Sequence, residues 1–168
     1  MVLEGFVIAR AAASVILAGV LLTGTAGCTF ITTRQTRAAY DPGDGVNATI
    51  GTIGLRNTVA LVGTDGQAVS LLVSIFNNGD KAVKVNLGYD VDGSQKTQSV
   101  VIGAGKVGHF GYESADSKSQ IIISGTGVKA GELLPLFVQY GEETGQTILV
   151  PVLDGSLPQY ADLIAPDV

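Results

Sequence analysis

The chain has little of what several common protein classes require. Its 168 residues include no tryptophan, one histidine and one cysteine, and only 15% of them are charged. A single cysteine excludes an internal disulfide. Acidic residues outnumber basic ones by 15 to 10, which leaves a net charge of −5. Because phosphate recognition relies on clustered lysine and arginine, this balance argues against a nucleic-acid-binding protein.

Hydrophobic residues and glycine, in contrast, are plentiful. Hydrophobic residues make up 46% of the chain, and there are 23 glycines. A hydrophobic share of this size excludes a disordered chain, and no internal period indicates a repeat protein. The length suits one domain, or one domain with a processed end.

The one long apolar segment lies near the N-terminus. Residues 11–22 carry no charge, and Ser14 is their only polar side chain. This length is typical of the roughly 7–15-residue core of a signal peptide, and it falls short of the roughly 20 residues that cross a bilayer. A longer span would include Arg10, at a cost of about 2.5–3.5 kcal/mol at the membrane centre. We therefore predict a signal peptide over residues 1–27.

The four residues Thr25, Ala26, Gly27 and Cys28 follow this segment. They resemble a bacterial lipobox, with Thr25 at the position where leucine is most frequent. The resemblance implies a diacylglycerol on the Cys28 sulfur and cleavage between Gly27 and Cys28. Because each buried CH₂ contributes about 0.8 kcal/mol, several acyl chains would hold the protein on the cell membrane, at its extracytoplasmic face. An uncleaved anchor and an ordinary secretory signal are the alternatives.

The rest of the chain divides into a tether, a domain and a tail. Residues 28–48 show no hydrophobic periodicity and predict a flexible tether. Residues 49–155 alternate short β-like runs with turn signals, and residues 156–168 form a tail that packs on the domain or is loose. About seven short strands predict an all-β, immunoglobulin-like β-sandwich. The predicted strands are 53–62, 68–76, 82–90, 99–102, 121–124, 133–140 and 147–153.

Two local signals refine this prediction. Asp92 and Gly93 indicate a tight hairpin, because glycine tolerates the positive φ that such turns need. Pro135 indicates an edge strand or a bulge, because proline has no N–H to donate.

Two motifs look like binding sites but lack the required context. Gly103, Gly105 and Gly108 follow a β-like run with the spacing of a dinucleotide-binding loop, yet no amphipathic helix follows them, so we interpret residues 103–108 as a turn. Residues 90–94 begin like a calcium loop, but Gln95 replaces the required glycine. We predict no metal site and no cofactor.

Candidate catalytic groups are equally sparse. Glu142 and Glu143 are adjacent, so in an extended chain their side chains point to opposite faces. His109 has no serine, cysteine or aspartate beside it in a nucleophile motif. We therefore predict no catalytic residue and a protein that is not an enzyme.

Two families share the order of these features. Residues 70–89 have a strand, an Asn-Gly-type turn and a returning strand, which is similar to exported PCu(A)C-type copper chaperones. Those domains bind copper through methionine and histidine, whereas Met1 and His109 are the only such residues here. The signal with Cys28, the hairpin of residues 68–80 and the run 150–152 more closely resemble actinobacterial cell-envelope lipoproteins of the LpqE kind. That resemblance implies location and fold rather than an activity.

These observations together favour a membrane-anchored, non-enzymatic binding or structural module of the cell envelope. Its membrane contact would be the covalent lipid on Cys28. Its other partner would be an envelope protein or polymer, contacted by the sandwich loops or by an edge strand such as residues 133–140. A small-molecule or metal carrier, and an enzyme whose site is not visible in the sequence, are the alternatives.

Overall fold

The computed structural model describes residues 2–25, 43–63, 66–112 and 120–165, in two compact units, Met1–Tyr40 and Asp41–Val168. In the first unit the described residues form one helix, α1 (Val2–Thr25), which contains the apolar segment. Within the described residues, no helix combines the length and hydropathy that a membrane span needs. The predicted site residues Ala26, Gly27 and Cys28 lie outside the described residues.

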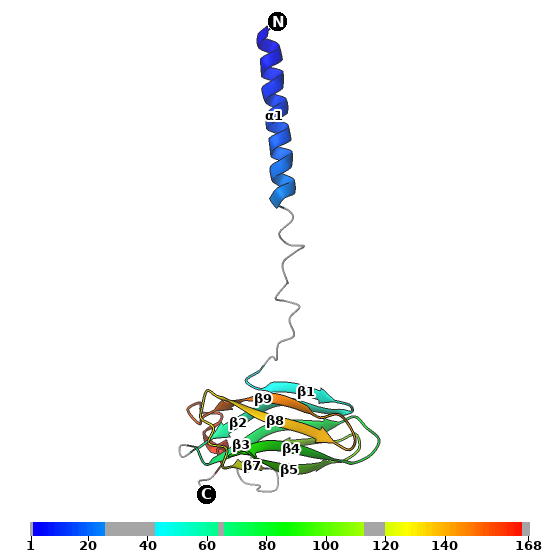
Figure 1. The fold of residues 1–168 in the computed structure, drawn as a ribbon, viewed down its shortest axis with the longest axis vertical. Coiled ribbons are helices and arrows are strands. Elements are labelled where there is room, and N and C mark those ends of the chain that lie inside the picture. Colours follow the sequence, from blue (N-terminus) through cyan, green and yellow to red (C-terminus); the bar gives the residue numbers. More distant parts are fainter. Residues whose placement is uncertain (1, 26–42, 64–65, 113–119, 166–168) are drawn as a thin grey trace. The chain divides into compact units, whose positions relative to one another are not determined.

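The second unit is built from strands (Figure 1). Its described residues form a nine-stranded sheet in the order β5-β4-β8-β9-β2-β3-β6, with β1 paired to β2 and β7 paired to β3. The predicted all-β, sandwich-like fold is confirmed. The strands are β1 (Val46–Ile50), β2 (Ile53–Val62), β3 (Ala68–Asn77), β4 (Val83–Val91), β5 (Ser94–Ile102), β6 (Val107–Phe110), β7 (Ile121–Ser124), β8 (Leu133–Tyr140) and β9 (Gln146–Leu153).

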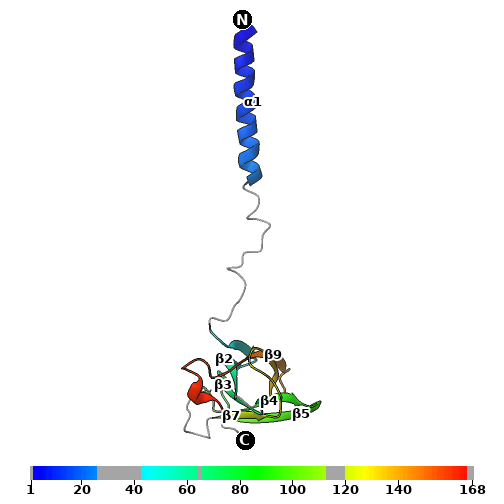
Figure 2. The ribbon, with the colours of Figure 1, turned by 90° about the vertical axis from the view of Figure 1, so that its left-hand side faces the viewer.

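The sheet curls so that its inner face encloses one core (Figure 2). Most neighbouring strands are antiparallel, but β2 and β9 run parallel, with Ala60 opposite Val152 and Leu61 opposite Leu153. This parallel pair joins the layer around β2 and β3 to the layer around β4 and β8. Alternate residues of these strands face inward, as a period of two requires. The largest fully buried side chains include Ile53, Leu55, Leu71, Ile75, Leu87, Ile123 and Leu136.

Two strands were not predicted. The start of β1 falls in the stretch assigned to the tether, and Val46 pairs with Thr58 while Ala48 pairs with Leu55. Ala48 and Ile50 are buried, so even this short polar-apolar alternation contributes to the core. The other strand, β6, begins inside the run 103–108 that we interpreted wholly as a turn, and it pairs with β3.

The strand, turn and returning strand predicted for residues 70–89 do not form a hairpin. β3 pairs with β2, β6 and β7, whereas β4 pairs with β5 and β8. After Asn77 the chain therefore crosses from one layer to the other. The predicted β4–β5 hairpin is confirmed, because Val91 pairs with Ser94 across Asp92 (φ 51°) and Gly93 (φ 78°).

Asn77 explains why the chain crosses at this point. Its side chain is 1% exposed, and its amide donates to the carbonyl oxygens of Lys81 (2.7 Å), Ile102 (3.2 Å) and Gly103 (3.2 Å). Its side-chain oxygen accepts the N–H of Gly79 at 2.8 Å. One buried amide thus satisfies backbone groups of both the β3–β4 crossing and the end of β5, and its bond to the Ile102 carbonyl is fully buried.

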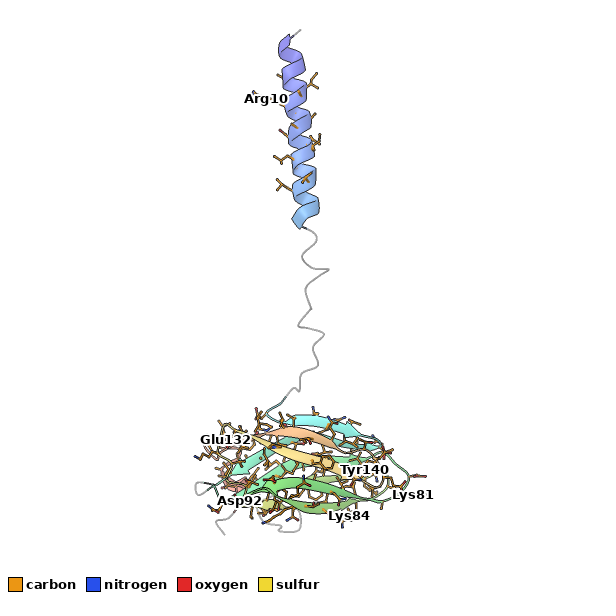
Figure 3. All side chains as sticks on the ribbon, viewed as in Figure 1. Arg10, Lys81, Lys84, Asp92, Glu132 and Tyr140 are labelled. Carbon is orange, nitrogen blue, oxygen red and sulfur yellow. The ribbon has the colours of Figure 1, made fainter. Side chains whose placement is uncertain are left out.

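A tyrosine closes the same end of the sandwich. The hydroxyl of Tyr140, at the end of β8, accepts the N–H of Thr52 at 2.8 Å and lies 3.1 Å from its hydroxyl. The carbonyl of Thr52 accepts the N–H of Asn78 at 2.9 Å. Figure 3 shows Tyr140 and Lys81 at this end, and Glu132 and Asp92 at the other. We call the end that holds Tyr140 and Lys81 the closed end.

Pro135 is not on an edge strand, because β8 lies between β4 and β9. The edge-strand prediction is therefore wrong, although the reason behind it holds locally. The β4–β8 ladder stops at the pair of Gly88 and Phe137, two residues from Pro135, while the β8–β9 pairing continues past it to Leu133. The missing N–H thus falls where β8 has a neighbour on one side only.

Replacing Asn77 by alanine is expected to lower the free energy of unfolding by about 1–3 kcal/mol, because it removes the buried bond to the Ile102 carbonyl together with three part-buried bonds. Urea denaturation of the variant measures this loss. Asn78→Ala is the matched control, since Asn78 is exposed and one residue away. Equal stability of the two variants would show that Asn77 does not hold the crossing.

Candidate functional site

A pocket of about 660 Å³ opens at the end of the sandwich opposite the closed end. Three segments line it: the end of β2 with the turn into β3, the loop of residues 127–130, and residues 154–156 together with Ile164. The position follows from β2, which begins beside Thr52 and ends at Val62 in the pocket wall. Pockets of about 300–1,000 Å³ are typical of small-molecule sites.

The loop that forms one wall is fixed at both of its ends. The N–H of Gly125 donates to the carbonyl of Gln67 at 2.9 Å, and the N–H of Gly131 donates to that of Val152 at 2.8 Å. Both glycines have positive φ (79° and 88°), a conformation that other residues rarely adopt. Between these points, the backbone N–H of Lys129 donates to the Glu132 carboxylate at 2.9 Å. The wall is therefore a braced loop.

The wall combines apolar side chains with a few polar ones. Val62, Val128, Ala130 and Ile164 supply the apolar part. Gln67, Lys129, Asp154 and Ser156 supply the polar part. An apolar wall binds by excluding water, and a few polar groups fix the orientation of what is bound.

Among the lining residues, Lys129 and Asp154 are the charged ones, and their charges are opposite. Hydrogen bonds from Ser156, first from its side chain and then from its backbone N–H, lower the pKa of Asp154 below its ordinary value. The backbone bond to the Asp154 carboxylate measures 3.0 Å. Lys129 and Asp154 give the pocket one positive and one negative group.

The tail supplies the last wall. Tyr160 is buried among Val59, Leu61 and Leu72 on the outer face of the sheet, and a short 3-10 helix, η3 (Ala161–Leu163), leads from it to Ile164. Of the two possibilities left open for the tail, residues 156–165 pack on the sandwich. Residues 166–168 lie outside the described residues.

A hydrogen bond fixes Tyr160 in place. Its hydroxyl donates to the carboxylate of Asp44 at 2.6 Å. A residue near the start of the domain thus binds a residue near its end. This bond first, and burial second, raise the pKa of Tyr160 to about 12. Because Ile164 follows Tyr160 closely, the same contact positions the pocket wall.

His109 has a partner that the sequence did not predict. Its Nδ1 lies 2.9 Å from the Ser74 hydroxyl, because Ser74 and His109 are paired on β3 and β6. The Tyr112 ring meets the imidazole edge-on at 6.3 Å. Arg56, on β2, is paired with Ser74. The guanidinium of Arg56 lies 4.7 Å from the centre of the Phe76 ring.

Arg56, Ser74 and His109 lie in one row on the outer face of the layer around β2, β3 and β6. Within the described residues, His109 has no carboxylate partner, and it does not line the pocket. Its side chain is exposed, whereas general-base catalysis needs a histidine positioned against a bound substrate. Glu142 and Glu143 lie in the β8–β9 turn, at the end opposite the pocket.

The two rejected motifs are structural. The N–H of Lys106 donates to the carbonyl of Gly103 at 3.1 Å in a turn that leads into strand β6, with no helix N-terminus. The carboxylate of Asp90 accepts the N–H of Gly93 at 2.8 Å and so caps the hairpin. Across the part of the chain that the structure describes, no three histidine, cysteine or acidic residues gather as metal ligands.

The pocket could not be predicted from the sequence, because its wall comes from three segments that are distant along the chain. A local signal did exist, in the glycine-rich run 125–131 and in residues 154–156, where an Asx turn follows β9. Neither signal reveals that the two runs meet.

Comparison with known proteins identifies the fold. No protein-family model and no curated protein matches the chain. Among solved structures, the apo PCuAC domain from PmoF1 is 13% identical, with a TM-score of 0.50 over 64% of this chain and 98% of that one. The apo PCuAC domain from PmoF2 is 8% identical, with a TM-score of 0.49 over 67% of this chain and 98% of that one.

The likeness to the PmoF1 domain shows a shared fold and nothing finer. It supports the resemblance to PCu(A)C-type domains at the level of architecture. The closer resemblance to lipoproteins of the LpqE kind stays a prediction.

Alkaline pH is expected to weaken the Tyr160 contact. Because the folded-state pKa is raised from 10 to about 12, its stabilisation is complete below pH 10 and is lost as the pH rises through 12. Urea denaturation at pH 7 and pH 11 should show Tyr160→Phe to be less stable than the wild type by about 1 kcal/mol at pH 7, with a smaller difference at pH 11. Tyr89→Phe, at a buried tyrosine of β4 away from Asp44, is the control, and a Tyr160→Phe deficit that does not shrink at pH 11 would contradict the assignment.

Proposed function

We propose that this chain is a lipid-anchored, extracytoplasmic binding protein whose sandwich domain holds a small ligand in the pocket without transforming it. The pocket is the observation that carries the binding role. Its volume of about 660 Å³, its braced walls and its mixed lining are those of a small-molecule site.

The pocket chemistry narrows the class of ligand. One cation and one anion, Lys129 and Asp154, give the lining no net charge, while the chain as a whole carries −5. Valine, alanine and isoleucine side chains require an apolar part on the ligand. We therefore propose a small amphipathic molecule whose polar part is neutral or zwitterionic.

The anchor rests on the N-terminal sequence. Residues 11–22 have the length and hydropathy of a signal-peptide core, and Gly27 and Cys28 follow at the distance that a lipobox requires. A lipid on Cys28 would keep the domain at the outer face of the cell membrane, where it would meet envelope components. The resemblance to cell-envelope lipoproteins of the LpqE kind supports the same location.

A binding role is preferred to catalysis because the one histidine of the chain, the most frequent general base, does not line the pocket. The histidine that pairs with Ser74 lies on the outer face of the β2–β3 layer instead.

A metal carrier is the second candidate, favoured by the fold shared with the apo PCuAC domain from PmoF1. His109 is the only histidine and Met1 the only methionine of the chain. Copper sites prefer imidazole and thioether ligands, so this chain would need ligands of another kind or from another molecule.

Cys28→Ala is expected to abolish incorporation of a fatty-acid analogue supplied to intact cells, because it removes the sulfur that would carry the lipid. The measurement is in-gel detection of the labelled chain, together with its distribution between membrane and medium. Thr29→Ala, which keeps the thiol, is the control and should label like the wild type. A wild-type chain that is unlabelled and shed into the medium would overturn the anchor.

Ala130→Phe is expected to abolish ligand retention, because a phenyl ring at this exposed wall position fills the pocket without entering the core. Native mass spectrometry of the full chain isolated from membranes measures the retained mass. Ala104→Phe makes the same change in the exposed turn before β6 and should retain the mass. Equal retention by both variants would overturn the pocket assignment, and a metal adduct unaffected by Ala130→Phe would favour the second candidate.

A further inference from the structure

Strands β8 and β9 carry apolar side chains on both faces. Their inner residues, such as Leu136 and Val150, are fully buried. Their outer residues are apolar as well, yet Leu133 is 54% exposed, Leu149 52% and Phe137 41%. Strands of this composition are usually covered on both sides.

The register makes these outer residues one continuous surface. Leu133 pairs with Pro151, Pro135 pairs with Leu149, and Phe137 is the next outward residue of β8. Cross-strand partners lie about 4.5–5.5 Å apart at their Cβ atoms, so the five side chains adjoin. We call them the apolar face: Leu133, Pro135, Phe137, Leu149 and Pro151.

The apolar face is also free of charge. Strands β8 and β9 contain no aspartate, glutamate, lysine or arginine, although the chain carries a net charge of −5. The neighbouring strand β4 differs, with Lys84 and Asp90 exposed. An exposed, contiguous apolar surface of this kind is typical of an interaction site.

The connection to the anchor indicates what covers the apolar face. The edge of β2 is shared by β1, which pairs Val46 with Thr58, and by β9, which pairs Val152 with Ala60. The domain therefore begins next to β9. Residues 29–42 separate Cys28 from the first described residue of the domain, and a flexible chain of that length spans roughly 20 Å on average.

We propose that the apolar face docks on the lipid bilayer that holds the anchor, with Leu133, Phe137 and Leu149 in contact with the interfacial region. This inference rests on the proposed lipid at Cys28. A short tether raises the local concentration of bilayer around the domain to about the millimolar range, so a weak intrinsic affinity is sufficient. Because none of the five side chains of the face is charged, placing them in the interfacial region desolvates no charge.

The absence of tryptophan from the chain permits a direct test. Phe137→Trp places a single indole on the apolar face, and Val107→Trp places one on β6, where the native valine is 54% exposed. Each full-length variant, lipidated at Cys28, is reconstituted in phosphatidylcholine–phosphatidylglycerol vesicles with brominated acyl chains. Bromine quenches indole fluorescence only at close range.

We expect about twofold quenching in Phe137→Trp and none in Val107→Trp, because only the apolar face reaches the acyl chains. Adding Leu149→Glu to Phe137→Trp should abolish the quenching, since a carboxylate opposes insertion. Equal quenching in both tryptophan variants, or none in Phe137→Trp, would overturn the proposal. A dimer of the lipid-free chain by sedimentation, lost in Leu149→Glu, would instead assign the face to a second copy.

Failure of the anchor can be separated from failure of the apolar face. The intact mass of the chain from cells reports whether Cys28 carries a native lipid. If it does not, the proposed anchor is wrong, but the free thiol, the only one in the chain, can be coupled to a maleimide phospholipid. Quenching of Phe137→Trp with this synthetic anchor then still decides whether the apolar face docks on lipid.

Discussion

Asn77 occupies the point at which the chain leaves one layer and enters the other, and both layers depend on it. Its amide satisfies three carbonyl oxygens that belong to the crossing and to the end of β5. In a protein with one cysteine, no disulfide can fix this corner, so a buried side-chain amide does so. Beside it, the N–H of Asn78 donates to the carbonyl of Thr52, and the N–H of Thr52 donates to the Tyr140 hydroxyl, so polar contacts close this end of the core.

The opposite end is organised differently, and this difference creates the pocket. There the loop of residues 125–131 is bonded at both of its ends, through Gly125 to Gln67 and through Gly131 to Val152, and its residues 127–130 line the pocket. The tail completes the wall because Tyr160 is held by Asp44. The sandwich therefore has one closed end and a pocket at the other end. The pocket is the basis for proposing a binding protein.

Much of the fold could be predicted from local pattern. Alternation and turn residues predicted seven strands, and Asp92 with Gly93 predicted the β4–β5 hairpin. Which strands pair with one another was harder to predict. An Asn-Gly-type turn after Asn77 indicates a hairpin, and only the buried contacts of the Asn77 side chain show that the chain crosses to the other layer. The Ser74–His109 contact and the pocket were missed for the same reason. Both depend on residues that only the three-dimensional arrangement brings together.

The parallel β2–β9 pair has a consequence for how the protein acquires its structure. Ala60 and Val152 are neighbours in space but are separated by most of the domain sequence. Such a contact carries a large loop-closure entropy and forms late, so the two layers join only when the last strand is available. During synthesis, which starts at the N-terminus, the edge of β2 that pairs with β9 therefore stays unpaired until β9 has been made. During that interval the inward-facing side of β2 is exposed to chaperones and to aggregation.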